Sequence, residues 1–517
     1  MRCRSEQGQA ILLVVVACGL VLVGALGLAI DTAQLYGHQR MAQAAADAAA
    51  QAGIMSIFDG TNSTGLNPFG TGSPPSSFTC TTSDGRSPCV YARNDGFGAV
   101  ATDQVVIDFP SAATVGVDST TLSSSDPVNL LRCTITRPVA TGIMRLLGAG
   151  NSTTIKAVGV AAIVAVQQPV PLIVLHPTLL GSFFINGTPT ITICGGPSQS
   201  IQVNSNNSTA VQLKGGSNTV DLSHAGPLDP GDCSKGTGAD FGNWANSAPP
   251  EAAYPGGTCQ TGCTGLETGS AGRYVQPSSP IVDPLKDVVA PTDSGVAGGQ
   301  TTISGLAAQP WGCPALQTCT HFTPGTFAGG ILIKNTLAYF DPGLYYIPSG
   351  GFTMDSNSGA QMSTGVAGTG AFSGGGMLVF NSGNTKNDLI NINSNAGTKG
   401  PITLVGSDQS SVYKGILFFQ DRTSNAHIGT GPSPGHSLQG GGNMSLTGTI
   451  YITNTKATMV ADPTHYQNLL LQGHPGSATT ITGEIIVDTL SLGGTSGIKM
   501  NLNPAAINKV RQVALVH

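Results

Sequence analysis

The feature that most constrains the fold of this chain is an uninterrupted apolar segment near its N-terminus. Ala10 to Ile30 is a run of 21 apolar or small residues, and no charged side chain lies between Glu6 and Asp31. As a helix, this run is long enough to cross roughly 30 Å of hydrocarbon. The core of a signal peptide is usually only about 7 to 15 residues. The segment therefore predicts a retained transmembrane helix at residues 10–30.

The distribution of basic residues predicts the orientation of this helix. Arg2 and Arg4 precede it, and the next lysine or arginine is Arg40. The positive-inside rule then places residues 1–9 in the cytoplasm. We expect a single-pass protein of the cell inner (cytoplasmic) membrane, with the bulk of the chain periplasmic or extracellular. Two other fates of the N-terminus stay open: cleavage at "GLA", which ends at Ala29, and lipidation at Cys18, where "VVAC" resembles a lipobox.

An alanine-rich helix is predicted to continue outward over residues 31–53. Gly37 is the one glycine between Asp31 and Gly53, and alanine is the strongest helix former. Leucine and alanine recur every seven residues, which gives a stripe of shrinking side chains: Leu28, Leu35, Ala42 and Ala49. Such a stripe suits close packing of another helix. A helix formed by propensity alone, without a partner, is the alternative.

The order of residues in this region resembles the N-terminal segment of the TadE/TadG-like family. Glu6, "GQA" from Gly8, the apolar span, "LAID", Tyr36 and "MAQAAADAAAQAG" follow one another over about fifty residues. The resemblance implies a membrane-anchored protein associated with assembly of Flp (tight adherence, Tad) pili. Pilins carry a glutamate five residues into the mature helix; that place is Leu13 here, so the sequence departs from the pilin pattern.

The rest of the chain has the composition of a secreted, strand-rich protein. Only 49 of 517 residues are charged, 22 basic and 27 acidic, whereas 71 are glycine. Such a sequence favours short strands and turns over amphipathic helices. The net charge of −5 and the lack of basic clusters argue against binding of nucleic acid.

The cysteines indicate an oxidising compartment. Close pairs in loop-like sequence, "CTTSDGRSPC" and "CPALQTC", favour local disulfides. Cys259 and Cys263 have no histidine pair at ligand spacing, so zinc is not predicted. Nine of the eleven cysteines lie beyond the apolar segment, which leaves one thiol over: Cys80, Cys89, Cys133, Cys194, Cys233, Cys259, Cys263, Cys313 and Cys319.

A small α+β module is predicted at residues 54–168. "DQVVIDFP", "NLLRCTITRPV" and "STTIKAVGVAAIVAV" are typical of strands, and "ATGIMRLLG" at residues 140–148 is typical of a short helix. This pattern is similar to the extracytoplasmic module that commonly follows the helix in the family.

From Pro169 onward, a glycine followed by apolar and aromatic residues recurs. "GLYYI", "GMLVF", "GILFF", "GTIYI" and "GEIIV" start at steps of 33, 39, 33 and 35 residues: Gly343, Gly376, Gly415, Gly448 and Gly483. Irregular spacing about a constant mean predicts stacked coils with loops of varying length, a parallel β-helix-like β-solenoid. A β-sandwich, with strands every 8 to 12 residues or so, is the alternative. Phrases from Pro342 to Ile498 stand in the order of a region often found downstream of the Tad-like segment.

We therefore expect a mainly β chain built of consecutive parts. These are a cytoplasmic tail at 1–9, a transmembrane helix at 10–30, an Ala-rich helical stalk at 31–53, the α+β module at 54–168, the start of the solenoid at 169–223, a Pro-, Gly- and Ser-rich loop or insertion at 224–309, and the solenoid body at 310–517.

No catalytic, cofactor-binding or metal-binding residue is predicted. "FDGTNS" from Phe58 resembles the start of a von Willebrand A metal site, but the alternating strands and helices of that fold do not follow. Asp421 and Arg422 resemble the acid and base of a β-helix lyase, and structural charges at a coil corner are the alternative. The histidines are scattered in loops and there is no phosphate-binding loop; those considered are His224, His427, His436, His465 and His474.

The sequence favours a non-enzymatic, membrane-anchored envelope protein that assists assembly or anchoring of a Tad/Flp-type pilus or surface appendage. Its expected partners are the membrane and other pilus-assembly or envelope proteins. The alternatives are a surface adhesin and a polysaccharide-binding or lyase-type β-helix protein. Aromatic residues that could stack on sugars are Tyr345, Tyr346, Phe418, Phe419 and Tyr451, and about half of them must point inward in alternating strands.

Overall fold

The computed structural model divides into two compact units. Residues 1–166 and 511–517 form the first, and residues 167–510 form the second. The structure describes residues 5–58, 76–100, 102–119, 122, 128–142, 151–167, 170–214, 219–245, 265–286, 288–305, 307–385, 387–393, 399–407, 413–424, 435–440, 444–454, 468–473, 479–495, 497–502 and 509–516. Most of "FDGTNS" and of the predicted helix at 140–148, together with Cys259, Cys263, His427, His465 and His474, lies outside these residues.

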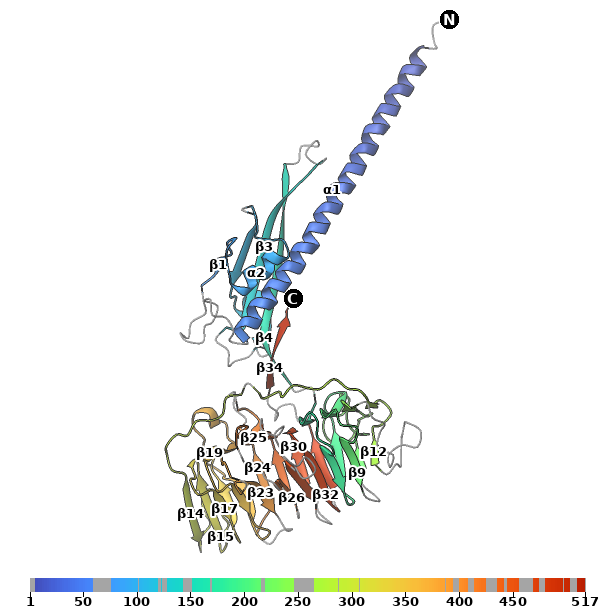
Figure 1. Cartoon of the computed structure of the whole chain (residues 1–517). Helices are drawn as coiled ribbons and strands as arrows, with labels where there is room; N and C mark the ends of the chain where they lie inside the picture. Colours follow the sequence, from blue (N-terminus) through green and yellow to red (C-terminus); the bar gives the residue numbers. More distant parts are fainter. Residues whose placement is uncertain are drawn as a thin grey trace. The chain divides into compact units, whose positions relative to one another are not determined.

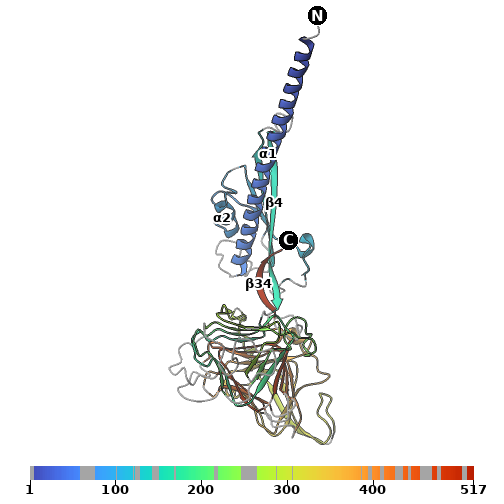
Figure 2. The same cartoon turned by 90° about the vertical axis from the view of Figure 1, so that its right-hand side faces the viewer.

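The first unit packs one long helix on a five-stranded antiparallel sheet (Figures 1 and 2). The strand order is β1-β2-β3-β4-β34, so the last strand of the chain pairs with β4. The three strands predicted in this module are confirmed as β2, β3 and β4. The elements are α1 (Ser5–Phe58), β1 (Phe78–Thr79), α2 (Ser87–Asn94), β2 (Gln104–Asp108), α3 (Ala112–Val115), β3 (Leu130–Ala140), β4 (Ser152–Gln167) and β34 (Lys509–Leu515).

The second unit consists of three long sheets, in which every pairing between named strands is parallel except that of β14 with β15. The chain is thus mainly β with an N-terminal apolar helix and parallel multi-strand sheets, as expected. Parallel pairing contradicts the alternative of an antiparallel sandwich, because strands that run in one direction need long crossovers in place of hairpins.

The three sheets of the second unit have eleven, ten and eight strands. The eleven-stranded sheet contains, in order, β12 (Gly265–Glu267), β10 (Thr219–Asp221), β7 (Thr190–Cys194), β33 (Gly497–Asn501), β30 (Thr479–Thr482), β27 (Met444–Thr447), β24 (Ile402–Val405), β21 (Gly359–Met362), β18 (Leu337–Phe340), β15 (Thr318–Thr323) and β14 (Gly299–Ser304). The ten-stranded sheet contains β13 (Tyr274–Val275), β11 (Asp240–Asn243), β8 (Gln199–Val203), β5 (Leu172–Val174), β31 (Ile485–Val487), β28 (Thr449–Ile452), β25 (Ile416–Gln420), β22 (Met377–Asn381), β19 (Gly343–Ile347) and β16 (Gly325–Thr326). The eight-stranded sheet contains β17 (Ile331–Ile333), β20 (Phe352–Met354), β23 (Ile390–Asn393), β26 (His436–Gly440), β29 (Leu469–Gly473), β32 (Leu490–Gly494), β6 (Phe183–Asn186) and β9 (Val211–Lys214), and a 3-10 turn, η3, spans Gly370–Phe372.

The recurring glycine phrases of the sequence are neighbouring strands of the ten-stranded sheet. They form β19, β22, β25, β28 and β31, and each pairs in parallel with the next. The glycine before each apolar run has a positive φ, for example 126° at Gly448. A Cβ on Gly448 would lie 2.7 Å from the carbonyl oxygen of Gly415, the matching glycine of the phrase before it. At Gly376, Gly448 and Gly483 the glycine is therefore required because the neighbouring backbone comes too close for a side chain.

The strands of the second unit are not stacked in sequence order. One run of strands, β5–β13, and a second run, β14–β33, meet where β31, β32 and β33 pair with β5, β6 and β7. Figure 1 shows the colours passing from yellow at β14 through orange to red at β32, and then to green at β9 and β12. The chain thus enters this unit in the middle of the stack, reaches one end, crosses to the other end and returns to the middle.

The crossing segment, residues 278–298, lies on the outer face of the ten-stranded sheet; we call it the strap. Its Leu285 is buried against Phe380, Phe419 and Tyr451. The strap belongs to the predicted loop or insertion at 224–309, and β11, β12, β13 and β14 also lie within that range.

Candidate functional site

Helix α1 has two halves with different surroundings. From Ile11 to Ile30 nearly every side chain for which burial is described is solvent-exposed and apolar; Leu13, for example, is 69% exposed. Among the described residues, this is the one helix long and apolar enough by length and composition to cross a membrane. The second half carries a buried alanine face: Ala42, Ala45, Ala46, Ala49 and Ala50. A change from exposed apolar to buried small side chains thus divides one continuous helix.

Asp31 lies at the boundary between the two halves. Its side chain is only 4% exposed, and its Oδ1 accepts a hydrogen bond of 3.1 Å from the backbone N–H of Gly142, just after the end of β3. A buried carboxylate needs such a donor. This contact fixes the end of β3 next to the last residue of the apolar run.

The alanine stripe packs on the sheet of the first unit. Ala42 and Ala49 are fully buried, Leu35 is partly buried, and Leu28 stays 44% exposed. The alternative of a helix without a partner is therefore wrong, and the expected helical partner is found in part, because Ala92 of α2 lies in the same buried cluster as the alanine face and the sheet. Small side chains allow a sheet to pack as closely as a helix. Gly159 on β4 permits this close packing, because a Cβ at that position would lie only 2.5 Å from the carbonyl of Ala46.

Two glutamines of α1 bind the open edge of β4. The Nε2 of Gln39 donates to the carbonyl of Lys156 at 2.8 Å, and that of Gln43 donates to the carbonyl of Val158 at 2.7 Å. Two residues on, the carbonyl of Val160 accepts from Val516, immediately after β34. Four residues of a helix and two residues of a strand both advance by roughly 6 Å along their axes. Glutamines four residues apart on α1 can therefore reach carbonyls two residues apart on β4. Gln39 and Gln43 thus provide hydrogen-bond donors for the carbonyls of β4 beyond the end of β34. This role was not predicted from the sequence, although the spacing of four residues between the two glutamines is visible there.

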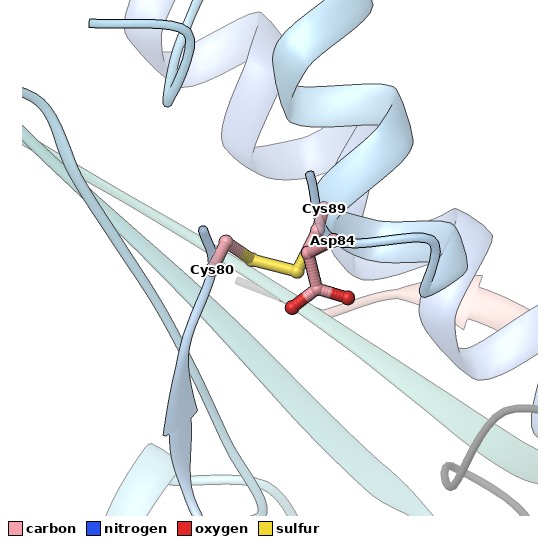
Figure 3. A group of neighbouring side chains, drawn as sticks. All are labelled: Cys80, Asp84 and Cys89. Carbon is pink, nitrogen blue, oxygen red and sulfur yellow. A yellow bond between two sulfur atoms is a disulfide. The ribbon is translucent and has the colours of Figure 1, made fainter. Parts of the chain in front are cut away.

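A second group of potential ligands lies beside α2. Cys80, Asp84 and Cys89 place their ligand atoms within 4.8 Å of one another (Figure 3). Cys80 and Cys89, however, form a disulfide, so neither offers the thiolate that a metal needs. The Arg86 guanidinium hydrogen-bonds Asp84 at 2.5 and 2.9 Å and holds the pKa of that carboxyl below its usual range. With the disulfide formed, the three residues stabilise the local fold through a covalent link and an ion pair.

The other described cysteines beyond the apolar run are either paired or buried. Disulfides join Cys194 to Cys233 and Cys313 to Cys319, and the second of these confirms the pairing favoured by close spacing. Cys133 on β3 is a buried free thiol, and burial, with smaller contributions from Asp108 and Asp47, raises its pKa to about 12. A thiol held neutral in this way is a poor nucleophile.

Asp421 and Arg422, which were compared with the acid and base of a β-helix lyase, both make structural contacts. Asp421 accepts hydrogen bonds of 2.8 Å from the backbone N–H and hydroxyl of Thr423 in its own turn. Arg422 donates to the carbonyls of Lys286 and Val288 in the strap. The structure therefore supports the interpretation of both as structural charges at a corner of the chain.

The described histidines among the candidates lie apart, and the contacts that follow are structural. His436 accepts a hydrogen bond of 2.9 Å from the N–H of Ile390, and the carbonyl of His224 accepts one from Gly195. Tyr345 and Phe418 point into the core, whereas Tyr346, Phe419 and Tyr451 lie on the strap-covered face. The expectation that about half would point inward is confirmed. Among the described residues, α1 and its seat on β4 remain the best candidate functional site.

Comparison with known families falls on this same helix. Residues 8–56 match the Tad family model, described as "Putative Flp pilus-assembly TadE/G-like". This segment is a TadE/G-like Flp pilus-assembly domain. The TadE/G-like helix thus includes both the exposed apolar half and the buried alanine face, and it ends within the last turn of α1. The resemblance inferred from "LAID", Tyr36 and the alanine-rich run is confirmed over these residues.

Other comparisons add little to the TadE/G-like assignment. The search of curated proteins found no match. Among solved structures, the competence-associated pilin ComZ from Thermus thermophilus aligns over 92% of this chain and 97% of its own, with 9% sequence identity and a TM-score of 0.25. A TM-score of this size does not establish a shared fold.

Proposed function

We propose that this chain is a non-enzymatic, single-pass protein of the cell envelope that assists assembly or anchoring of a Flp/Tad-type pilus or surface appendage. The observation that carries the proposal is the coincidence of the TadE/G-like match at residues 8–56 with α1. The exposed apolar half of that helix suits a bilayer, and the alanine half is already committed to its own sheet. The pilus-related contacts would therefore involve the membrane half.

The proposed topology keeps the order of parts expected from the sequence: residues 1–9 in the cytoplasm, 10–30 in the inner membrane, and the remainder periplasmic or extracellular. The lack of arginine and lysine between Arg4 and Arg40 supports this orientation. The disulfides of both units suit an oxidising compartment.

We further propose that the second unit is a β-solenoid. Its support is that strands three apart in sequence pair with each other through most of each sheet, for example β18 with β21 and β21 with β24. Successive strands thus go to different sheets, and each set of three makes one coil. Such a body would give the envelope protein a long, regular surface beyond the membrane.

The function is tested in two steps in the organism that encodes the chain. First, membranes are washed with carbonate and the mature N-terminus is sequenced; retention with a start near Met1 is expected, and a soluble protein that starts after Ala29 would contradict the topology. Second, a photo-crosslinking residue replaces Val23, which is 63% exposed. We expect capture of pilus-assembly proteins, with a crosslinker at exposed Thr301 of β14 as the matched control. Equal yields from both positions would contradict a role for the membrane half.

A further inference from the structure

The outer face of the ten-stranded sheet is unusually apolar for the outside of a stack. Four aromatic side chains from successive strands form a ladder, with ring centroids 5.3 Å apart for Tyr346–Phe380, 5.4 Å for Phe380–Phe419 and 5.0 Å for Phe419–Tyr451. This is why the recurring phrases lack polar alternation: the strands are buried on both faces, by the core on one side and by the strap on the other.

The sheet holds the strap chiefly through its main chain. Asn204, next to β8, makes a two-way contact with Ile281: its Nδ2 donates to the carbonyl at 2.6 Å, and its Oδ1 accepts from the N–H at 2.9 Å. Arg422 donates to the carbonyls of Lys286 and Val288, and the hydroxyl of Tyr413 donates to that of Val289 at 2.9 Å. Contacts of this kind recognise any extended segment, whatever its side chains.

Two side chains of the strap give the contact its selectivity. Leu285 is 1% exposed and lies among the aromatic ladder, and Asp283 accepts a hydrogen bond of 2.5 Å from the Tyr451 hydroxyl. Ser278 and Pro291 are also buried and Val288 packs beside the ladder, whereas Val282 is 69% exposed and Val289 is 74% exposed. A backbone held at several points with a few buried side chains is the pattern of a peptide in a groove.

The strap also lies outside the strand order. From β8 to β16 the ten-stranded sheet is continuous without it, and an isolated bridge from Ala297 to Thr326 joins its far end to β16. We propose that this outer face is a groove for an extended peptide of the pattern Asp-Pro-Leu, occupied in this structure by the chain's own residues 278–292, so that the strap is a dissociable ligand held in cis.

The test uses the full chain in detergent with residues 282–292 replaced by a Gly/Ser linker of equal length. A fluorescently labelled peptide of residues 278–292 is titrated in and its anisotropy is measured. We expect the replaced variant to bind the peptide and the unaltered chain to bind at least about tenfold more weakly, because its own strap competes at a high effective concentration. A Leu285→Ala peptide should lose about tenfold or more in affinity, whereas the matched Val282→Ala peptide should not.

A replaced variant that keeps its far-UV circular dichroism but binds no peptide would overturn the proposal, as would equal affinities of the two alanine peptides. Failure of the replaced variant to fold also counts against it, because a groove must exist without its occupant. A second measurement needs no replacement: limited proteolysis within 289–297 should be faster in the full chain with Leu285→Ala than with Val282→Ala. Equal rates would mean that the strap is a fixed part of the fold.

Discussion

Single residues decide where this chain is closely packed. Gly159 lets the backbone of α1 approach β4, and Asp31 binds the backbone next to β3 where the apolar run ends. Neither role was predicted from the sequence, because a glycine in a strand or an aspartate after an apolar run has no signature that names its distant partner. The glycines of the recurring phrases were recognised, since repetition gave a signal that an isolated residue lacks.

Glu484 is a residue whose ionisation should oppose folding. It is 1% exposed at the start of β31, and burial raises its pKa well above the usual range despite a hydrogen bond from Thr449. The folded state therefore binds this proton more tightly than the unfolded state, so stability is fully present below about pH 4.5 and falls as pH rises toward the raised pKa.

Replacing Glu484 with glutamine should remove this loss. We expect the thermal midpoint of the second unit to fall between pH 5 and pH 8 in the unaltered chain and to change less in Glu484→Gln, which should be the more stable of the two at pH 8. Both tryptophans, Trp244 and Trp311, lie in the second unit, so their fluorescence reports its unfolding. Parallel pH profiles of the two proteins would refute this assignment.

At the scale of elements, the helix and the strands with a repeated or alternating pattern were predictable, but the neighbours of the helix were not. The alanine run gave the length of α1 and its buried face, yet the same small side chains serve a helix or a sheet as neighbour. The strands of the ten-stranded sheet were found because glycine and apolar residues recur; β11, β12 and β13 are short and lie in a Pro-, Gly- and Ser-rich segment, where local composition favours a loop.

The close packing of α1 on β4 can be tested by adding one methyl group at Gly159. Gly159→Ala would place a Cβ 2.5 Å from the backbone of Ala46, so the helix must shift away from the sheet. We expect a loss of about 1–3 kcal/mol in local stability, measured as faster amide hydrogen exchange along β4. Gly85→Ala is the matched control, because nothing lies within 4 Å of its Cβ position. Unchanged exchange in Gly159→Ala would show that the close approach is not required.

At the scale of the whole molecule, the chain order differs from the spatial order. The second unit is inserted between β4 and β34, two neighbouring strands of the first unit's sheet. The sequence favours one body at residues 310–517, because nothing in "KVRQVALV" distinguishes a further coil from a strand that completes another sheet. Likewise, a repeat gives the step between neighbouring strands but not the point at which the chain enters the stack.

The last strand should therefore matter for the first unit. Val513 on β34 packs against the core of that unit, whereas Leu515 is 38% exposed. Val513→Asp would put a charge against this core, so we expect release of β34, faster hydrogen exchange along β4 and self-association through the uncovered edge. Leu515→Asp, the same change at a more exposed position two residues further along the strand, should leave all three unaltered. A monomeric Val513→Asp protein with protected β4 amides would contradict this role.

The strap also fixes a relation between two lengths. Between its contacts at Ile281 and Asp293 it passes eight strands of the ten-stranded sheet, β8 to β16. Seven spacings of about 4.8 Å make about 34 Å, and twelve extended residues span about 40 Å, so little slack remains. Because the chain enters and leaves at the middle of the stack, strands can be gained at either end without moving that junction. Each strand added to this sheet, however, requires between one and two further strap residues. The length of the strap therefore limits the number of strands in the stack.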